Sequence, residues 1–291
     1  MSQRRDVPTV TRRDIALGLA GVGLDPGDGV IVHASLSSFG RVTDGADAVV
    51  DAVLDVVGPE GTTVFPTFTG DAVGAAILGR SGRAGLVDLP DVPDVDLGDL
   101  RNVKERHIDT GAIPKAARRR DDFLKGTHPL YSIAAKGPLA AELVELSDRC
   151  IFASAKDKFI YRLGEHGGKA LLLGVGHLSN SAVHVVAEIA GLEYKVQDRP
   201  YWSLTVDEFL RMPRERQAEL VRRHFGATLP YDVEPHYERI EPALVAAKAI
   251  RFGRIGNAEV RLMKITDFVR VGLAALKRNP WMLVDKLPKS S

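Results

Sequence analysis

Cysteine is almost absent from this chain: Cys150 is the only one among 291 residues. A single cysteine excludes an internal disulfide, a thiolate zinc cluster and a cysteine-ligated iron–sulfur centre. Long apolar runs are also missing, since none approaches the ~20 residues that a membrane-spanning helix needs. Residues 1–14 contain several arginines but no apolar stretch behind them, so they do not resemble a secretory signal. We therefore expect a cytoplasmic protein that does not bind membranes.

Several common catalytic motifs are absent as well. The sequence has no Gly-x-Ser-x-Gly nucleophile elbow, no Gly-x-x-x-x-Gly-Lys-Ser/Thr phosphate loop and no His-Glu-x-x-His zinc motif. The Gly-Val-Gly at residues 174–176 lacks the third glycine of a dinucleotide-binding loop. The net charge is +1 and no motif combines aromatic with basic residues, so nucleic acid is not an expected partner.

The charge is nevertheless unevenly distributed, because residues 1–100 are net acidic and residues 101–291 are net basic. Aspartates recur within residues 86–100, and lysines and arginines recur within residues 101–125. One interpretation is a solvated acidic loop followed by a solvated basic helix. The other is an acidic rim for a cationic substrate beside a basic patch for a phosphorylated cofactor.

Hydrophobic periodicity predicts alternating strands and helices. The predicted strands are residues 29–33, 62–65, 131–135 and 169–173. The predicted helices are residues 46–57, 138–146, 181–190, 235–250 and 257–276. This order, with short turns, indicates an α/β fold. No change of composition marks a domain boundary, so we predict one domain over residues 1–291, with residues 235–291 as a peripheral C-terminal helical part.

The helix predicted to end near residue 190 carries His184 and Glu188 on one face, because residues four apart are neighbours on a helix. A carboxylate beside an imidazole raises its basicity and fixes its orientation, as a general base requires. A core histidine bonded to a buried glutamate has the same spacing. A metal site that also includes His177 is a third alternative.

Two polar segments precede or follow predicted strands. The first begins at His33, where the strand at 29–33 ends, and continues through Ser35, Ser37 and Ser38. Small residues and hydroxyls there let backbone N–H groups approach a phosphate. The second, residues 126–132, leads into the strand at 131–135. Either segment alone is equally typical of an ordinary serine-rich loop.

Taken together and in order, these segments resemble the aminoglycoside 3-N-acetyltransferase family. The matching motifs are Val-His-Ala-Ser-Leu-Ser-Ser-Phe-Gly at 32–40, Val-Gly-Pro-Glu-Gly-Thr at 57–62, Pro-Thr-Phe-Thr at 66–69, Gly-Ala-Ile-Pro at 111–114, His-Pro at 128–129 with Ser-Ile-Ala-Ala at 132–135, Leu-Leu-Leu-Gly-Val at 171–175, and Asn180-Ser181 with His184 and Glu188. The resemblance extends over residues 10–275. It implies a mixed central sheet with flanking helices, distinct from the commoner acetyltransferase superfamily.

The resemblance also implies roles for individual residues. Acetyl-CoA is the implied cosubstrate and no metal is expected. His184 would be the catalytic base, with Glu188 as its partner, although the family usually places this glutamate three residues after the histidine, where the chain has Ala187. The implied cofactor-binding residues are His33, Ser35, Ser37, Ser38, Arg118, His128 and Ser132.

The expected function is therefore transfer of an acetyl group from acetyl-CoA to an amine of an aminoglycoside or an amino-sugar-like metabolite, directly and with a histidine base. A protein of the same fold that binds CoA or a sugar without catalysis is an alternative, as is an acetyltransferase of a polysaccharide or natural-product pathway. The expected partner is a small-molecule amine acceptor, and a homodimer is left open.

Overall fold

The structure is a computed structural model, which describes residues 9–70, 72–73, 108–153, 155–192, 204–224 and 232–287. The aspartate-rich segment at 86–100 therefore lies outside the described residues, as do residues 1–8 of the arginine-rich N-terminus. Within the described part, no helix is long and apolar enough to cross a membrane.

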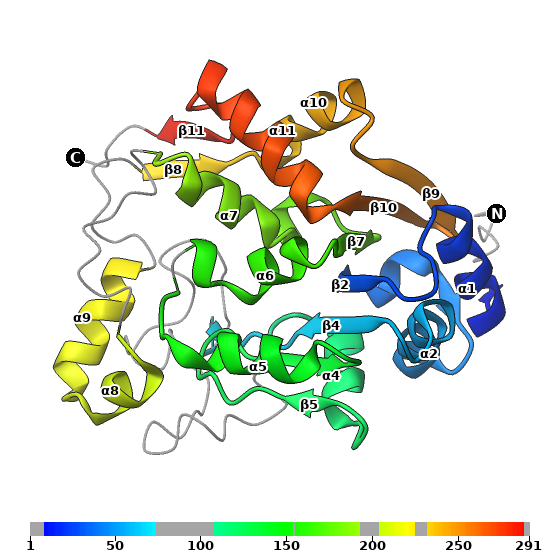
Figure 1. Cartoon of the computed structure of the whole chain (residues 1–291), viewed down its shortest axis with the longest axis horizontal. Coiled ribbons are helices and arrows are strands. Elements are labelled where there is room, and N and C mark those ends of the chain that lie inside the picture. Colours follow the sequence, from blue (N-terminus) through cyan, green and yellow to red (C-terminus); the bar gives the residue numbers. More distant parts are fainter. Residues whose placement is uncertain are drawn as a thin grey trace, which may run out of the picture.

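A seven-stranded mixed sheet forms the centre of the structure (Figure 1), in the order β5-β6-β4-β2-β7-β10-β9. Its strands are β2 Gly29–Ala34, β4 Thr62–Pro66, β5 Leu124–Lys125, β6 Ile133–Lys136, β7 Lys169–Leu173, β9 Arg251–Ile255 and β10 Ala258–Lys264. Strand β2 is parallel to both β4 and β7, while β6 is antiparallel to β4 and β10 is antiparallel to β7. The predicted mixed α/β sheet is thus confirmed.

Helices cover both faces of this sheet. The α-helices are α1 Arg12–Gly21, α2 Gly45–Val57, α4 Ala112–Arg119, α5 Ala140–Arg149, α6 Phe159–Glu165, α7 Ala182–Ile189, α8 Val206–Arg211, α9 Arg214–His224, α10 Glu241–Ala246 and α11 Ile265–Arg278. The single-turn 3-10 helices are η1 Leu36–Phe39, η4 Ala155–Asp157, η5 His177–Ser179 and η6 Tyr237–Ile240. The two small sheets pair β1 Thr9–Val10 with β3 Arg41–Val42 and β8 Asp232–Pro235 with β11 Val284–Leu287.

Two apolar clusters form the layers. On β2, Val30 and Val32 pack in one cluster with α1, α2 and α4, whereas Ile31 packs in the other with α5, α6, α7 and α11. Successive side chains of a strand point to opposite faces, so this alternation places helices on both sides of β2. A smaller cluster gathers α8 and α9 at one corner of the molecule (Figure 1).

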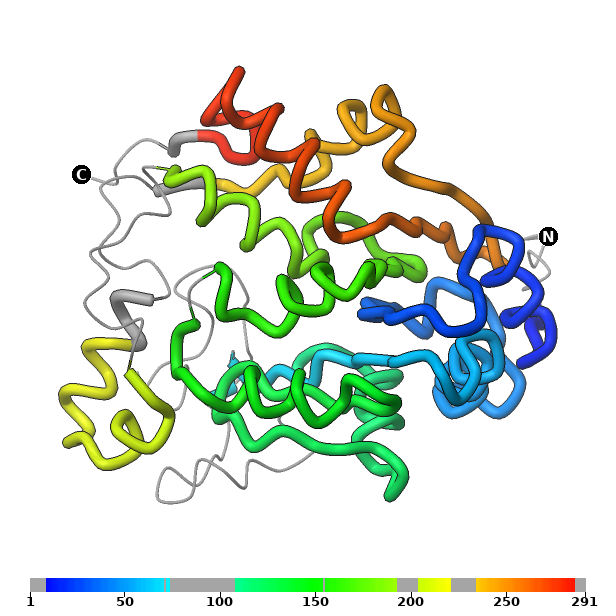
Figure 2. Tube along the Cα trace, in the orientation of Figure 1, coloured from blue at the N-terminus to red at the C-terminus, as the bar shows by residue number. Residues whose placement is uncertain are grey.

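The C-terminal part of the sequence prediction is wrong. Residues 251–264 form two strands of the central sheet, and β10 lies between β7 and β9, so this part is not a peripheral helical segment. Figure 2 shows the consequence: β9 lies beside α1, which comes from the other end of the chain. Strand β10 alternates buried Val260 and Leu262 with the more exposed Glu259 and Arg261, which is the period of a strand. The helix predicted over residues 235–250 is present as η6 followed by α10, and the helix predicted over residues 257–276 is present in its second half as α11. The single-domain expectation stays a prediction.

The strand order creates a switch point beside β2. The next strand along the chain, β4, lies on one side of β2, and β7 lies on the other. In open α/β sheets, ligands bind in the crevice at the carboxyl ends of the strands where the order reverses in this way. The loops that follow β2 and β7 contain the serine-rich segment and the His184 helix. The fold therefore brings two of the predicted site segments to one place.

Candidate active site

His33 is buried where β2 ends, on the same face of the sheet as α7. Its Nε2 atom accepts the Ser181 N–H at 3.4 Å, at the start of α7. Burial lowers the pKa of His33 from 6.5 to about 4, so the ring is neutral at physiological pH. A neutral imidazole offers no charge to a phosphate group. The contact that the structure gives His33 joins the β2 strand to the helix of the predicted base.

The three serines after β2 have different environments. Ser38 Oγ donates to the Gly174 carbonyl at 2.8 Å and so links the loop after β2 to the loop after β7. Gly174 has φ +66°, and a Cβ there would collide with Ser38, so only glycine permits this contact. Ser35 Oγ and Ser37 Oγ lie 3.1 Å apart, with Ser37 exposed and Ser35 half-buried. Contact of these two hydroxyls with a ligand stays a prediction.

His184 is exposed on α7, while its neighbours Val183 and Val185 are buried. The interpretation of His184 as a core histidine is therefore wrong. The ring meets the buried ring of Tyr237 edge to face, with centroids 5.8 Å apart. Asn180 Oδ1 accepts the Ala182 N–H at 3.1 Å, at the first residue of the helix, while the N-cap residue Ser181 makes no side-chain cap bond.

Glu188 lies one turn after His184, at the end of α7. Its Oε1 atom forms an ion pair with Lys158 Nζ at 2.5 Å, and the two side chains are only 16% and 23% exposed. Lys158 is the residue that precedes α6. This contact fastens α7 to α6, a role that the sequence did not reveal. A partnership between Glu188 and His184 stays a prediction.

His128 lies in the loop before β6, and both of its ring nitrogens face backbone groups. Its Nδ1 atom accepts the N–H groups of Leu130 and Tyr131 at 3.0 and 2.8 Å. Its Nε2 atom faces the Cys150 carbonyl at 3.1 Å and donates to it in the matching tautomer. Both ring nitrogens are thus engaged, and contact of His128 with the cofactor stays a prediction.

Ser132 and Arg118 form a buried network with the strand next to β2. Ser132 Oγ lies 2.9 Å from Thr67 Oγ1 and 2.9 Å from Arg118 Nη1, and Arg118 Nη1 also donates to the Gly126 carbonyl at 3.0 Å. Thr67 follows β4, so this network lies at the same edge of the sheet as the serine loop. Contact of Ser132 and Arg118 with a cofactor stays a prediction.

His177 belongs to a cluster with Glu238 and Glu241, whose ligand-type atoms lie within 4.8 Å of one another. Burial lowers the pKa of His177 despite the opposing pull of the two glutamates, so this ring too is neutral. Glu238 accepts two backbone N–H groups, and Glu241 Oε2 accepts from Arg261 Nε at 2.6 Å. Arg261 supplies the positive charge of this cluster, so the donor set does not fit a metal ion. The predicted metal alternative that joined His177 to His184 has no support here.

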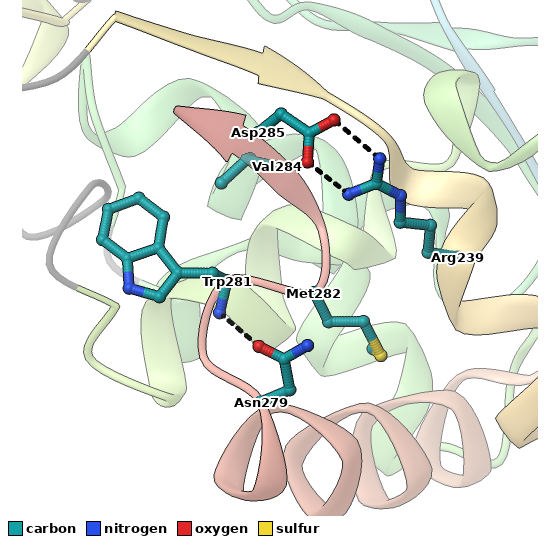
Figure 3. A pocket seen from close by; sticks show the side chains of 6 residues that line it. All are labelled: Arg239, Asn279, Trp281, Met282, Val284 and Asp285. Atoms are coloured by element: carbon teal, nitrogen blue, oxygen red, sulfur yellow. Dashed lines mark hydrogen bonds and ion pairs between the residues drawn. The ribbon is translucent and has the colours of Figure 1, made fainter. Parts of the chain in front are cut away.

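A pocket of about 380 Å³ opens beside the β8–β11 pair (Figure 3). Arg239 and Asp285 face each other across two bonds of 2.7 Å, which neutralise both charges. The other residues that line the pocket are Asn279, Trp281, Met282 and Val284. None of the predicted site residues lines this pocket.

Sequence reasoning missed Lys158, Tyr237 and Glu238. Tyr237 and Glu238 lie in a segment predicted only as helix, and no motif marks any of the three. The sequence shows only a glycine near this contact: in the structure Gly176 adopts φ −101°, which any residue can adopt, yet a Cβ there would collide with the Glu238 carboxylate. A glycine without a backbone reason indicates a close neighbour, but the sequence does not say which.

The fold and site define an α/β protein in which the serine-rich loop after β2 and the helix of the exposed His184 after β7 lie at the same edge of the central sheet. The profile of the family described as aminoglycoside 3-N-acetyltransferase matches residues 31–277. The chain belongs to this family of acyltransferases, as the sequence predicted.

Two relatives and two solved structures illustrate the likeness. Aminoglycoside N(3)-acetyltransferase IX of Micromonospora chalcea is 30% identical over 253 residues, which cover 86% of this chain and 87% of that protein. Aminoglycoside N(3)-acetyltransferase VIII of Streptomyces fradiae is 28% identical over 268 residues, 91% of each. Sisomicin-bound AAC-VIa aligns with a TM-score of 0.65 at 24% identity, over 93% of this chain and 99% of that one. The CoA complex of AAC-IIIb aligns at 0.63 and 21% identity, over 93% and 97%.

Proposed function

We propose that this chain transfers the acetyl group of acetyl-CoA to an amine of an aminoglycoside or amino-sugar-like metabolite, with His184 as general base. The observation that carries the proposal is the exposure of His184 on a helix that starts at the switch point. A general base must reach the proton that it removes, and a buried ring cannot do so. Membership of the acetyltransferase family supports the reaction type.

The loops after β2 and β7 have groups that suit the cosubstrate. Acetyl-CoA supplies an acetyl group activated as a thioester. The Ser35 and Ser37 hydroxyls present donor and acceptor capacity to a pyrophosphate or a pantetheine amide. The Ser38–Gly174 contact holds this loop against β7, so the hydroxyls stay at a fixed distance from the start of α7. A solved CoA complex of a protein of the same fold supports acetyl-CoA as the cosubstrate.

The chemistry moves protons as well as the acetyl group. An amino-sugar amine is largely protonated at neutral pH, and only the neutral nitrogen attacks a carbonyl carbon, so the ammonium form first loses one proton to solvent. In our proposal His184 accepts the second proton, which the nitrogen releases as the new C–N bond forms and the C–S bond breaks. CoA leaves as the thiolate and takes up a proton to become the free thiol. An acyl-cysteine route is disfavoured, because burial raises the pKa of the Cys150 thiol and keeps it protonated.

The acceptor class is inferred from the relatives. The curated relatives are named for aminoglycosides, and solved neighbours of the same fold include complexes with gentamicin, apramycin and sisomicin. The chain itself is nearly neutral, which leaves less polycationic amino sugars among the candidates. Because acetyl-CoA is a metabolite of the cell interior, this function accords with the predicted cytoplasmic location.

The test is an acetylation assay with the purified chain, acetyl-CoA and two groups of amines, aminoglycosides and simple amino sugars. CoA release that depends on the amine, together with an acetylated product in the mass spectrum, is the expected result. Activity on the amino sugars alone would favour the biosynthetic alternative. Calorimetric CoA binding without transfer to any amine would contradict the proposal and favour a binding protein.

A further inference from the structure

Glu238 reaches across the fold to the loop that leads into α7. Its Oε2 atom accepts the His177 N–H at 3.0 Å, and its Oε1 atom accepts the Leu178 N–H at 3.1 Å. The carboxylate lies in η6, about sixty residues further along the chain, so this contact is tertiary rather than local. Two charge-assisted bonds from one carboxylate fix both the position and the orientation of the loop backbone.

Gly176 is the residue that admits this carboxylate. Its backbone conformation, φ −101° and ψ −167°, is extended and open to any residue. A Cβ at this position would collide with the Glu238 carboxylate. The glycine is thus explained by the approach of Glu238 and by nothing in the backbone. The loop and the carboxylate fit each other, which supports a built contact rather than a chance one.

Tyr237, the neighbour of Glu238, contacts the base itself. Its ring is buried and meets the exposed His184 ring edge to face at 90°, with centroids 5.8 Å apart. Aromatic rings favour this geometry, and the packed tyrosine limits the rotation of the imidazole. One turn of 3-10 helix therefore touches both the backbone before α7 and the side chain that α7 presents.

The rest of the loop backbone has neutral partners, while the His177 side chain lies 3.4 Å from Glu241 Oε2. The His177 ring stacks on Phe268 with centroids 5.6 Å apart, and Asn180 Nδ2 lies 3.3 Å from His177 Nδ1. The Ser181 N–H donates to His33 at 3.4 Å. Among the described hydrogen bonds of the loop backbone, those to Glu238 are the ones that involve a charged group.

We propose that Glu238 and Tyr237 are positioning residues of the transfer reaction: Glu238 sets the backbone that leads into α7, and Tyr237 sets the orientation of the His184 ring. This inference rests on the proposed role of His184 as base. Neither residue needs to touch the substrate. Their effect is on the geometry of proton transfer, which is sensitive to displacements of an ångström.

The experiment compares kcat and KM for Glu238→Gln and wild type, with the unfolding midpoint measured in parallel. The amide can accept only one of the two N–H groups, so we expect kcat to fall about 10- to 100-fold while both KM values change less than about twofold. The matched control is Glu241→Gln. Glu241 also lies beside His177, but its carboxylate accepts from Arg261 and not from the loop backbone. An equal loss of kcat in both variants would overturn the inference.

Three further variants guard against a simple failure to fold. Gly176→Ala places a methyl group against the Glu238 carboxylate and displaces it from the loop backbone. This variant should therefore lower kcat, as Glu238→Gln does. Tyr237→Phe keeps the ring and should exceed Tyr237→Leu in kcat about tenfold. An equal kcat for the last two variants would remove Tyr237 from the proposal.

His184→Gln, assayed alongside, separates the two proposals. If it keeps wild-type kcat, the base assignment fails and the positioning roles fall with it. If it loses activity while Glu238→Gln keeps kcat, only the positioning inference is wrong.

Discussion

The buried imidazole of His33 makes the stability of this protein depend on pH in a defined direction. Its pKa is about 4 in the folded chain, against 6.5 for an ordinary histidine, because burial disfavours the charged ring. The unfolded state therefore binds more protons below pH 6.5, and acidification favours unfolding. Above pH 6.5 both states are neutral at this position and the effect vanishes.

Linkage gives the size of this effect. The two pKa values predict a loss of unfolding free energy of about 0.8 kcal/mol at pH 6 and about 2 kcal/mol at pH 5, with a limit of about 3.4 kcal/mol below pH 4. The variant His33→Gln keeps an acceptor for the Ser181 N–H but does not titrate. The difference in the free energy of unfolding between wild type and variant should equal the contribution of His33 titration, since the other groups titrate equally in both proteins.

The assay is urea unfolding of both proteins at pH 7.5, 6 and 5 at constant ionic strength. We expect the stability of wild type relative to His33→Gln to decline by about 2 kcal/mol between pH 7.5 and 5. A difference that stays flat over this range would refute the assignment of His33 as a buried neutral ring. A rise on acidification would mean that a neighbouring anion stabilises the charged ring.

Two further predictions concern stability. His128→Ala removes the acceptor of two N–H groups and the partner of the Cys150 carbonyl, so it should cost about 2–4 kcal/mol in urea unfolding, and a loss below about 0.5 kcal/mol would contradict the structural role. Lys158→Met leaves Glu188 largely buried without this cation and should cost about 1–3 kcal/mol, less than a fully buried pair because both side chains are partly exposed. The double variant with Glu188→Gln should recover part of that loss, and strictly additive losses would show that the pair is not coupled.

Local patterns predicted the framework of the fold. The apolar runs became β2, β4, β6 and β7, and the apolar face of α2 packs against the sheet as its spacing indicates. Strand β10 was missed because residues 257–276 were interpreted as one helix, although Val260 and Leu262 alternate with charged residues before the helical spacing starts at residue 265. The change from a strand period to a helical period at residue 265 therefore marks the end of β10, the strand that the sequence prediction missed.

The candidate site was predicted only in part, for a physical reason. The position of His184 follows from helical spacing and from the resemblance to the family. The partners of a side chain depend on which segments the fold brings together. Glu238 binds the loop before α7 from a segment distant in sequence, and Lys158 forms an ion pair with Glu188. His128 resembled a ligand-binding residue in sequence, but its role depends on the path of the backbone around it, which no motif encodes.

The central claim is that His184 accepts the proton of the acceptor amine. Its most direct test is kcat of His184→Gln under saturating acetyl-CoA and amine, since glutamine is polar and of similar size but cannot act as a base. The account predicts a fall of about 10²- to 10⁴-fold with CoA binding and the unfolding midpoint retained. A variant that turns over at the wild-type rate would contradict it.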